Sequence, residues 1–486
     1  MLAPLPKCLL PKCLPSASPS ASHFDDIVRI NRAITELNDN ISALPEIRRI
    51  SEGIQATLEG TVGHTYSPKI DIKSALPEEI HRLLQGLALR VGDPKDGYQG
   101  DITELSLGGA NLIYLSLKLL EYESKISEDR VSHFLLIEEP EAHIHTHIQK
   151  TLFEKYGYQN TQVIVSTHST HISAATKVRS VNVLSRLGQE SAVFQPGAGL
   201  DAKECNRVER YLDAVRTTLL FAKGVMLVEG DAELILIPAL IKAVFGISLD
   251  ELGASLISMS AAIFTNVAVV FHDDRIQRRC AIVTDKDTSI VELPEDEDKD
   301  DDFQKKCRAS QESGELRSEK LDDFAADNRW VKPFYASHTF EVDLLQAGND
   351  EMVSSLLDEI YSRERDRTES SEKLGSTDVA IAGKEVLRLA KKVGKGWFSL
   401  LLAEKVSPEA SIPEYLLSAL AFACQDSIDS RTLKLIGLHR LKTLDPKTED
   451  FKSLAPDKFI AAYSAKFETD PLTHFVNCLP EDSCDE

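Results

Sequence analysis

Acidic residues follow two apolar segments in the middle of the chain, and their spacing suits metal binding. Glu229 ends the first segment, and a helix starting there would bring Glu233, four residues on, to a neighbouring position. Asp285 ends the second segment, and Asp287 points the same way as Asp285 in an extended chain. Four such carboxylates repel one another unless hard cations such as Mg²⁺ or Mn²⁺ neutralise them. The pattern predicts a two-metal centre of the kind that hydrolyses phosphodiesters.

A second set of residues, nearer the N-terminus, is suited to nucleotide hydrolysis. Glu138 and Glu139 follow the apolar segment 134–137, so one carboxylate can hold Mg²⁺ while the next orients water toward a γ-phosphate. Another apolar segment, 162–165, leads to His168, and an imidazole at the end of a neighbouring strand can reach the same phosphate. The pattern indicates a site of the ATPase type.

Glycines upstream of these acids offer a place for phosphate. Ser106, Gly108 and Gly109 precede a helical stretch, where glycines permit close backbone approach and the first helix N–H groups can bind an anion. No G-x-x-x-x-G-K-[ST] loop occurs in the 486 residues, and the pair Gly60 and Gly63 does not replace it. Because the phosphates then lack a cradle and a lysine, we expect this chain alone to bind little ATP.

Strands and helices must bring these residues together. Short apolar runs alternate with helical stretches over 105–186 and again over 224–334, which is typical of α/β domains with parallel strands. The carboxyl ends of parallel strands meet at one crevice, so the acids would converge there. The segments 24–60, 345–395 and 405–470 are expected to be helical.

Composition limits the classes of protein that fit. Lys and Arg number 55 against 77 Asp and Glu, and the formal net charge of −22 excludes nucleic-acid binding by bulk charge. The eight cysteines are scattered, without the paired spacing of a zinc site or the density of a secreted disulfide scaffold. No apolar run reaches the roughly 18 residues that span a bilayer. We expect an intracellular, cytoplasmic protein without a membrane anchor, and a nuclear or organellar address stays open.

The first set of motifs resembles the signature motif, Walker B segment and switch histidine of ABC-type ATPase heads. The run EEPEAHIH, which begins at Glu138, is similar to the head of the OLD (overcoming lysogenization defect) family. The resemblance implies that Glu138 serves Mg²⁺, Glu139 polarises water and His168 senses the γ-phosphate. It also implies that three residues contact nucleotide held by the opposite subunit: Ser106, Gly108 and Gly109.

The second set resembles the Toprim domain of topoisomerases, primases and OLD nucleases. Two later motifs extend the resemblance to the OLD branch: TFEVDL, which contains Glu341, and GKGWF, which contains Lys395. The resemblance implies that Glu341 joins the metal ligands Glu229, Glu233, Asp285 and Asp287. It implies that Lys395 stabilises charge on the transition state. Together the two resemblances cover approximately residues 24–400.

The expected fold class is α/β, with a partial ABC-type ATPase head followed by a Toprim-like parallel α/β domain with helical insertions. A glycine- and proline-rich stretch near 188–205 is the expected boundary. The expected parts are a disordered leader (1–23), the head with a helical arm (24–200), the Toprim domain (205–400), and a helical C-terminal region (401–486).

These expectations combine into a metal-dependent DNA endonuclease that acts as a homodimer. Glu229 would be a metal ligand or general base, Asp285 and Asp287 would hold Mg²⁺ or Mn²⁺, and ATP use would require a missing N-terminal part or a Walker A-bearing partner chain. Two alternatives remain: a catalytically silent interaction protein, and an ATPase subunit that completes a partner's nucleotide site. Metal-dependent nicking of plasmid DNA distinguishes the first alternative, and ATP turnover with a partner distinguishes the second.

Overall fold

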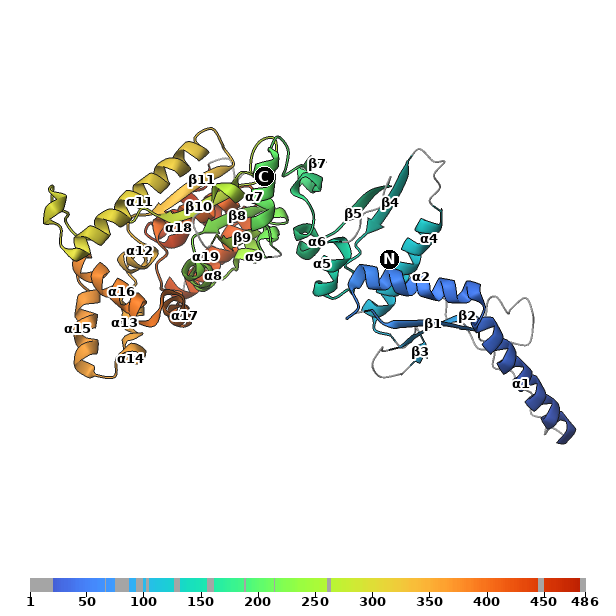
Figure 1. Ribbon diagram of the computed structural model, residues 1–486. Helices are drawn as coiled ribbons and strands as arrows, with labels where there is room; N and C mark the ends of the chain where they lie inside the picture. Colours follow the sequence, from blue (N-terminus) through green and yellow to red (C-terminus); the bar gives the residue numbers. More distant parts are fainter. Residues whose placement is uncertain are drawn as a thin grey trace. The chain divides into compact units, whose positions relative to one another are not determined.

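The computed structural model places the chain in two compact units, Met1–Thr167 and His168–Glu486 (Figure 1). The division precedes the glycine- and proline-rich stretch near 188–205. The structure describes residues 21–65, 67–74, 87–92, 99–101, 105–125, 132–154, 161–187, 189–213, 215–259, 264–444 and 450–480. The expected leader therefore lies outside the described residues up to residue 20.

The first unit contains helices and two small sheets. The expected single helical stretch 24–60 is two helices, because Pro45 occupies the first turn of the second one and the preceding Leu44 is extended (φ −57°, ψ 139°). Three antiparallel strands follow, which the sequence did not indicate. The elements are α1 (Ala21–Ser42), α2 (Pro45–Val62), β1 (Lys69–Ser74), β2 (Leu87–Gly92), β3 (Gln99–Asp101), α4 (Leu107–Lys125), β4 (His133–Glu138), α5 (Thr146–Glu154) and β5 (Thr161–Ser166).

The core of the second unit is a four-stranded parallel sheet in the order β11-β10-β8-β9. Its strands are β8 (Gly224–Val228), β9 (Ala254–Ser258), β10 (Cys280–Asp285) and β11 (Val331–Ala336). All five residues of β8 are buried, as expected for a central strand covered on both faces. The α/β prediction is confirmed.

Two hydrophobic cores lie on the two faces of this sheet. Met226 and Val228 pack with helices that include α8 (Asp231–Phe245) and α18 (Glu414–Cys424). Val225 and Leu227, which alternate with them, pack on the other face with residues that include Leu321 of α11 (Asp302–Ala325). The strand period of two thus divides one apolar run between two cores.

The remaining elements of the second unit are mostly helical. One hairpin, β6 (Val183–Leu187) with β7 (Glu190–Phe194), precedes the parallel sheet. The other helices are α6 (Thr170–Ala174), α7 (Ala202–Tyr211), α9 (Leu249–Leu252), α10 (Thr265–Ala268), α12 (Phe340–Gln346), α13 (Asp350–Ser354), α14 (Leu357–Ile360), α15 (Glu364–Leu374), α16 (Val379–Val393), α17 (Lys395–Lys405), α19 (Ser430–Leu444), α20 (Pro456–Lys466) and α21 (Pro471–Asn477). Short 3₁₀ helices cover Val178–Ser180, Arg216–Leu220, Glu297–Lys299 and Asp450–Ser453. No helix among the described residues combines the length and hydropathy needed to cross a membrane.

The acidic stretch 292–302 is mostly exposed but contains one buried carboxylate. Arg308 of α11 donates to both carboxylate oxygens of Asp300 (2.7 and 3.0 Å) and to the Pro294 carbonyl (2.7 Å). The Asp300 side chain is only 1% exposed. A paired carboxylate can thus be buried in a run that is otherwise exposed.

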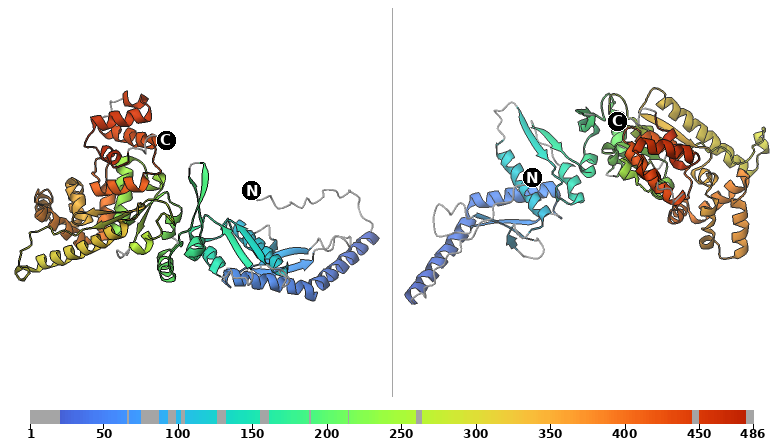
Figure 2. Two further views of the ribbon diagram at one scale, coloured as in Figure 1. Left: turned by 90° about the horizontal axis from the view of Figure 1, so that it is seen from above. Right: turned by 180° about the vertical axis from the view of Figure 1, so that it is seen from behind.

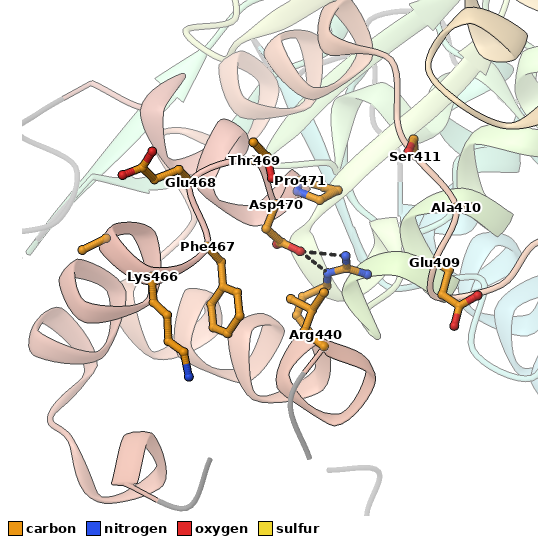
Figure 3. A pocket seen from close by; sticks show the side chains of 12 residues that line it. Glu409, Ala410, Ser411, Arg440, Lys466, Phe467, Glu468, Thr469, Asp470 and Pro471 are labelled. Carbon is orange, nitrogen blue, oxygen red and sulfur yellow. Dashed lines mark hydrogen bonds and ion pairs between the residues drawn. The ribbon is translucent and has the colours of Figure 1, made fainter. Parts of the chain in front are cut away.

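A buried ion pair joins the C-terminal helices, which Figure 2 shows in red. Arg440 of α19 donates to Asp470, which precedes α21, through Nε (3.0 Å) and Nη2 (2.7 Å) (Figure 3). Both side chains are at most 5% exposed. They lie at a surface pocket of about 470 Å³, and Arg440 also donates to the Pro408 carbonyl.

We expect Asp470→Asn to lower the free energy of unfolding of the second unit by about 3 kcal/mol, since it leaves a buried guanidinium unpaired. Tryptophan fluorescence during urea unfolding measures this unit, because both tryptophans, Trp330 and Trp397, belong to it. The control is Asp426→Asn, which removes the partner of Arg279 in an exposed pair and should cost less than about 1 kcal/mol. Equal effects of the two substitutions would contradict the importance of the buried pair.

Candidate functional site

Neighbouring strands of the parallel sheet bring Glu229 and Asp285 together. Glu229 follows β8, Asp285 ends β10, and the two strands are hydrogen-bonded in parallel register. The Asp285 N–H donates to Glu229 Oε1 (3.3 Å), and the Thr284 hydroxyl donates to the same oxygen. The two predicted site residues therefore meet at the carboxyl edge of the sheet.

Two further carboxylates enter from helices. Glu233 lies in the first turn of α8, is 8% exposed, and accepts a hydrogen bond from the Gly230 N–H (3.2 Å). Glu341 lies in the first turn of α12, and its side chain is 3% exposed. Lys395, the first residue of α17, places Nζ 3.2 Å from Glu341 Oε1. The helical segment between these two residues thus returns the chain to the sheet.

Asp287 is held by backbone geometry and by an arginine. Its φ of +53° is uncommon for a residue other than glycine, and its N–H donates to the His338 carbonyl (3.0 Å). Arg317 Nη2 donates to Asp287 Oδ2 (2.9 Å) and to the Asp285 carbonyl (2.6 Å), and lies 3.5 Å from Glu229 Oε1. One guanidinium therefore bridges three of the site's residues.

Helix α11 can approach closely enough to place Arg317 because of a glycine. A Cβ on Gly314 would lie 2.1 Å from the Lys286 carbonyl oxygen, far inside van der Waals contact. Only a residue without a side chain fits between α11 and the segment that follows β10.

Crowding of negative charge defines the electrostatics of the site. Burial, together with the carboxylates of Glu229, Glu233, Asp287 and Glu341, raises the pKa of Asp285 well above its ordinary value. Burial is also the main reason that the pKa of Glu233 is raised, and Glu229 and Glu341 add to it. The pKa of Asp287 is raised by burial although Arg317 and Lys395 act in the opposite direction. Bound cations would relieve this repulsion.

Lys395 is a cation despite its environment. Burial opposes its charge, but Glu341, and then Asp285 and Glu233, raise its pKa above the ordinary value. The side chain remains 63% exposed, so the ammonium both faces the carboxylates and is open to solvent.

The predicted nucleotide-binding residues of the first unit lie around α4 and the segment after β4. Ser106 Oγ accepts a hydrogen bond from the Gly109 N–H (3.3 Å) at the start of α4. A Cβ on Gly108 would lie 2.2 Å from the His143 carbonyl oxygen, so this glycine permits close packing within the unit. Gly108 therefore has a role in packing, in addition to the predicted role in phosphate binding.

The predicted acids of this unit lie at the end of a parallel strand pair. Glu138 is the last residue of β4 and pairs in register with Ser166 of β5. Glu139 has a φ of +41°, and its N–H donates to the Ser166 carbonyl (2.9 Å). His168 follows β5 by two residues and is the first residue of the second unit.

Family models match both halves of the chain. Residues 17–173 match the AAA ATPase domain, and residues 220–287 match the Toprim domain of overcoming lysogenization defect protein-like proteins. The chain joins an AAA ATPase domain to a Toprim domain of the OLD type. The resemblance found in the motifs is confirmed, and the Toprim match includes Glu229, Glu233, Asp285 and Asp287.

Solved structures add weak likenesses. The C-terminal region of the Burkholderia pseudomallei OLD protein is 26% identical over 43% of this chain and 98% of its own, with a TM-score of 0.32. The corresponding region from Xanthomonas campestris pv. campestris is 25% identical over 43% of this chain and 95% of its own, with a TM-score of 0.30. An SMC ATPase structure is 18% identical over 30% of this chain and 81% of its own, with a TM-score of 0.24. No protein with a curated description matches the chain.

The donor chemistry of the Toprim site fits hard divalent cations. Its carboxylate oxygens are the ligands that Mg²⁺ and Mn²⁺ prefer, and the raised pKa values show that the negative charge there is poorly compensated. Within the described ranges, no three acidic, histidine or cysteine side chains are already arranged around a metal position. Arg317 and Lys395 instead lie against Glu229, Asp287 and Glu341, so these side chains would have to turn toward a cation.

Sequence reasoning missed two residues of the Toprim site. Arg317 lies on α11, thirty residues beyond Asp287, and an isolated arginine in a charged helix carries no motif. Tyr415 lies in the first turn of α18, in a region that the motifs did not connect to the site. Only the packing of these helices on the sheet reveals either residue.

We expect Asp285→Asn to raise the melting temperature of metal-free protein by about 2 °C or more, since it removes a carboxylate that repels its neighbours. A raised pKa in the folded state means that wild-type stability falls as the pH rises through that pKa, so the gain should be largest at high pH. Thermal unfolding in EDTA across a pH series measures this difference.

Asp327→Asn, in the exposed turn after α11, is the matched control and should leave the melting temperature unchanged. A lower melting temperature for Asp285→Asn at every pH would show that the Asp285 carboxylate stabilises the fold.

Proposed function

We propose that this chain is a metal-dependent DNA endonuclease of the OLD type, with two divalent cations in its Toprim site. The Toprim domain belongs to a nuclease-type family. The observation that carries the proposal is the meeting of Glu229, Glu233, Asp285 and Glu341 at one edge of the sheet, with Lys395 beside them. Such a set has little use in a purely structural domain, because its crowding costs stability.

In this proposal the carboxylates bind and orient, and Lys395 stabilises charge. Glu229, Glu233, Asp285, Asp287 and Glu341 would hold Mg²⁺ or Mn²⁺, which supply positive charge at the scissile phosphate and an acidified water. Glu229, which is 27% exposed, would act as a metal ligand or as the general base that accepts a proton from the attacking water.

Lys395 would stabilise the negative charge that grows on the phosphate as the nucleophile adds. Its raised pKa keeps the ammonium protonated at neutral pH. The Glu341 carboxylate, 3.2 Å away, aims the ammonium at the site and leaves most of the lysine exposed to substrate.

We expect the purified chain to nick plasmid DNA with Mg²⁺ or Mn²⁺ and to lose this activity in EDTA. Asp285→Ala should abolish cleavage, and Lys395→Ala should lower the cleavage rate about 10²-fold, the effect of losing one preorganised electrostatic contact. Lys395→Arg should rescue poorly, because a planar guanidinium does not replace a compact ammonium. Supercoiled-plasmid assays at several metal concentrations measure these rates.

The matched control is Lys405→Ala, at the other end of α17, where the lysine pairs with Glu359 (2.8 Å). It should cut at the wild-type rate. Cleavage by Asp285→Ala at the wild-type rate would refute the Toprim assignment and favour the catalytically silent interaction protein.

The ATPase domain is proposed to act with nucleotide held by another subunit. Ser106, Gly108 and Gly109 would contact that nucleotide, Glu138 would serve Mg²⁺, and Glu139 would polarise water. A homodimer, or a partner chain with a Walker A loop, would complete the site. The reason is the absence of a G-x-x-x-x-G-K-[ST] loop from these 486 residues.

We expect this chain alone to bind ATP with a dissociation constant well above the micromolar range, because its phosphates would lack the loop and its lysine. Isothermal titration calorimetry with ATP and Mg²⁺ measures the affinity, and Glu139→Gln provides a background for turnover. Micromolar binding by the wild-type chain would show that other residues replace the loop.

A further inference from the structure

The C-terminal end of helix α18 lies at the amino ends of the Toprim strands, where Asp426, just beyond the helix, pairs with Arg279, just before β10 (3.0 Å). Near its C-terminal end, a Cβ on Gly224 would lie 1.8 Å from the Ala423 carbonyl oxygen, which places Ala423 beside the start of β8. From Ala423 back to Tyr415 the helix spans about 12 Å. Strand β8 covers about 13 Å from Gly224 to Val228. Because α18 packs on β8, β10 and β11, these similar lengths bring Tyr415 toward the carboxyl edge of the sheet.

The Tyr415 hydroxyl is a buried polar group with no hydrogen-bond partner in the structure. The negative charges of four carboxylates act on this hydroxyl: Asp285, Asp343, Glu233 and Glu341. Burial, followed by these carboxylates, raises the pKa of the phenol well above its ordinary value, so the group keeps its proton. A hydroxyl buried without a partner costs stability, and a protonated phenol beside carboxylates is a hydrogen-bond donor facing acceptors.

We propose that Tyr415 is a positioning residue of the Toprim centre, whose hydroxyl donates to the Asp285 carboxylate when that carboxylate turns to hold a cation. This role rests on the proposed metal-dependent function. A carboxylate that binds a cation through one oxygen can accept an O–H bond at its other oxygen. Such a bond fixes the orientation of the ligand and commonly changes metal affinity 10- to 100-fold. Asp285 ends β10, one of the strands on which α18 packs, and its N–H is already held by Glu229.

In this proposal the C-terminal region contributes to the site through α18. Leu416, Leu417 and Leu420 of α18 are buried in the core that contains Met226 and Val228. The helix thus packs in the same core as β8, the strand that positions Glu229. In the proposal, its first turn lies next to the carboxylates.

The test is Tyr415→Phe, which removes only the hydroxyl oxygen. Binding of Mn²⁺ is followed by electron paramagnetic resonance of the free ion, a measurement that does not need catalysis. We expect the variant to bind Mn²⁺ roughly 10-fold more weakly. Its melting temperature in EDTA should be unchanged or higher, because an unpartnered buried hydroxyl is removed. Cleavage should recover at saturating Mn²⁺, so the metal concentration for half-maximal activity changes and the limiting rate does not.

The matched control is Tyr361→Phe. Its hydroxyl is also buried without a partner, but its ring lies against Lys392 (3.6 Å) and Arg388, and the carboxylates that act on it, Glu385 and Asp366, are not those of the Toprim site. It should bind Mn²⁺ like the wild type.

The outcomes separate this role from the function on which it rests. Equal Mn²⁺ affinity in wild type and Tyr415→Phe would overturn the role of Tyr415 and leave the metal centre in place. A weaker affinity accompanied by a lower melting temperature in EDTA would also overturn it, since the hydroxyl would then support the fold. Wild-type protein that binds no Mn²⁺ would overturn the metal centre, and the role of Tyr415 with it.

Discussion

Electrostatic repulsion among buried carboxylates is the constraint on which the second unit depends. Asp285, Glu233 and Asp287 are each held in surroundings that raise their pKa values. A fold tolerates such crowding only if the surrounding packing and hydrogen bonds over-determine it. The parallel sheet provides that support, because strand pairing and two hydrophobic cores fix where each acid emerges.

Two cations of the chain itself partly compensate the crowding, and both come from helices. Arg317 lies in the middle of the long helix α11 and bridges the strand-end acids. Lys395 starts α17 and pairs with Glu341. A metal ion would compete with these two side chains for the same carboxylate oxygens. Without metal, Arg317 and Lys395 balance part of the negative charge, and a cation could replace them. The close approach at Gly314 makes the placement of Arg317 possible, since a Cβ there would collide with the Lys286 carbonyl oxygen.

The two units reuse one arrangement for different chemistry. In each, acids follow a strand that pairs in parallel with a neighbour: Glu138 and Glu139 after β4, and Asp285 and Asp287 at the end of β10. In each, one of these acids has a positive φ, Glu139 at +41° and Asp287 at +53°. A positive φ breaks the regular alternation of side chains along a strand. It therefore allows consecutive or alternate acids to point into the same crevice.

The sequence by itself determined the α/β class, the apolar strands and the acids at their ends, because burial on both faces requires continuous apolar runs such as Val225 to Val228. It also indicated Glu341 and Lys395, through motifs known from a family. It did not indicate the strands β1 to β3, which are at most six residues long, or the burial of Asp300 in an acidic run. Only the tertiary structure decided that Arg317 and Tyr415 join the site. Their helices lie far from the strand-end motifs along the chain, and a contact made by helix packing leaves no local pattern in the sequence.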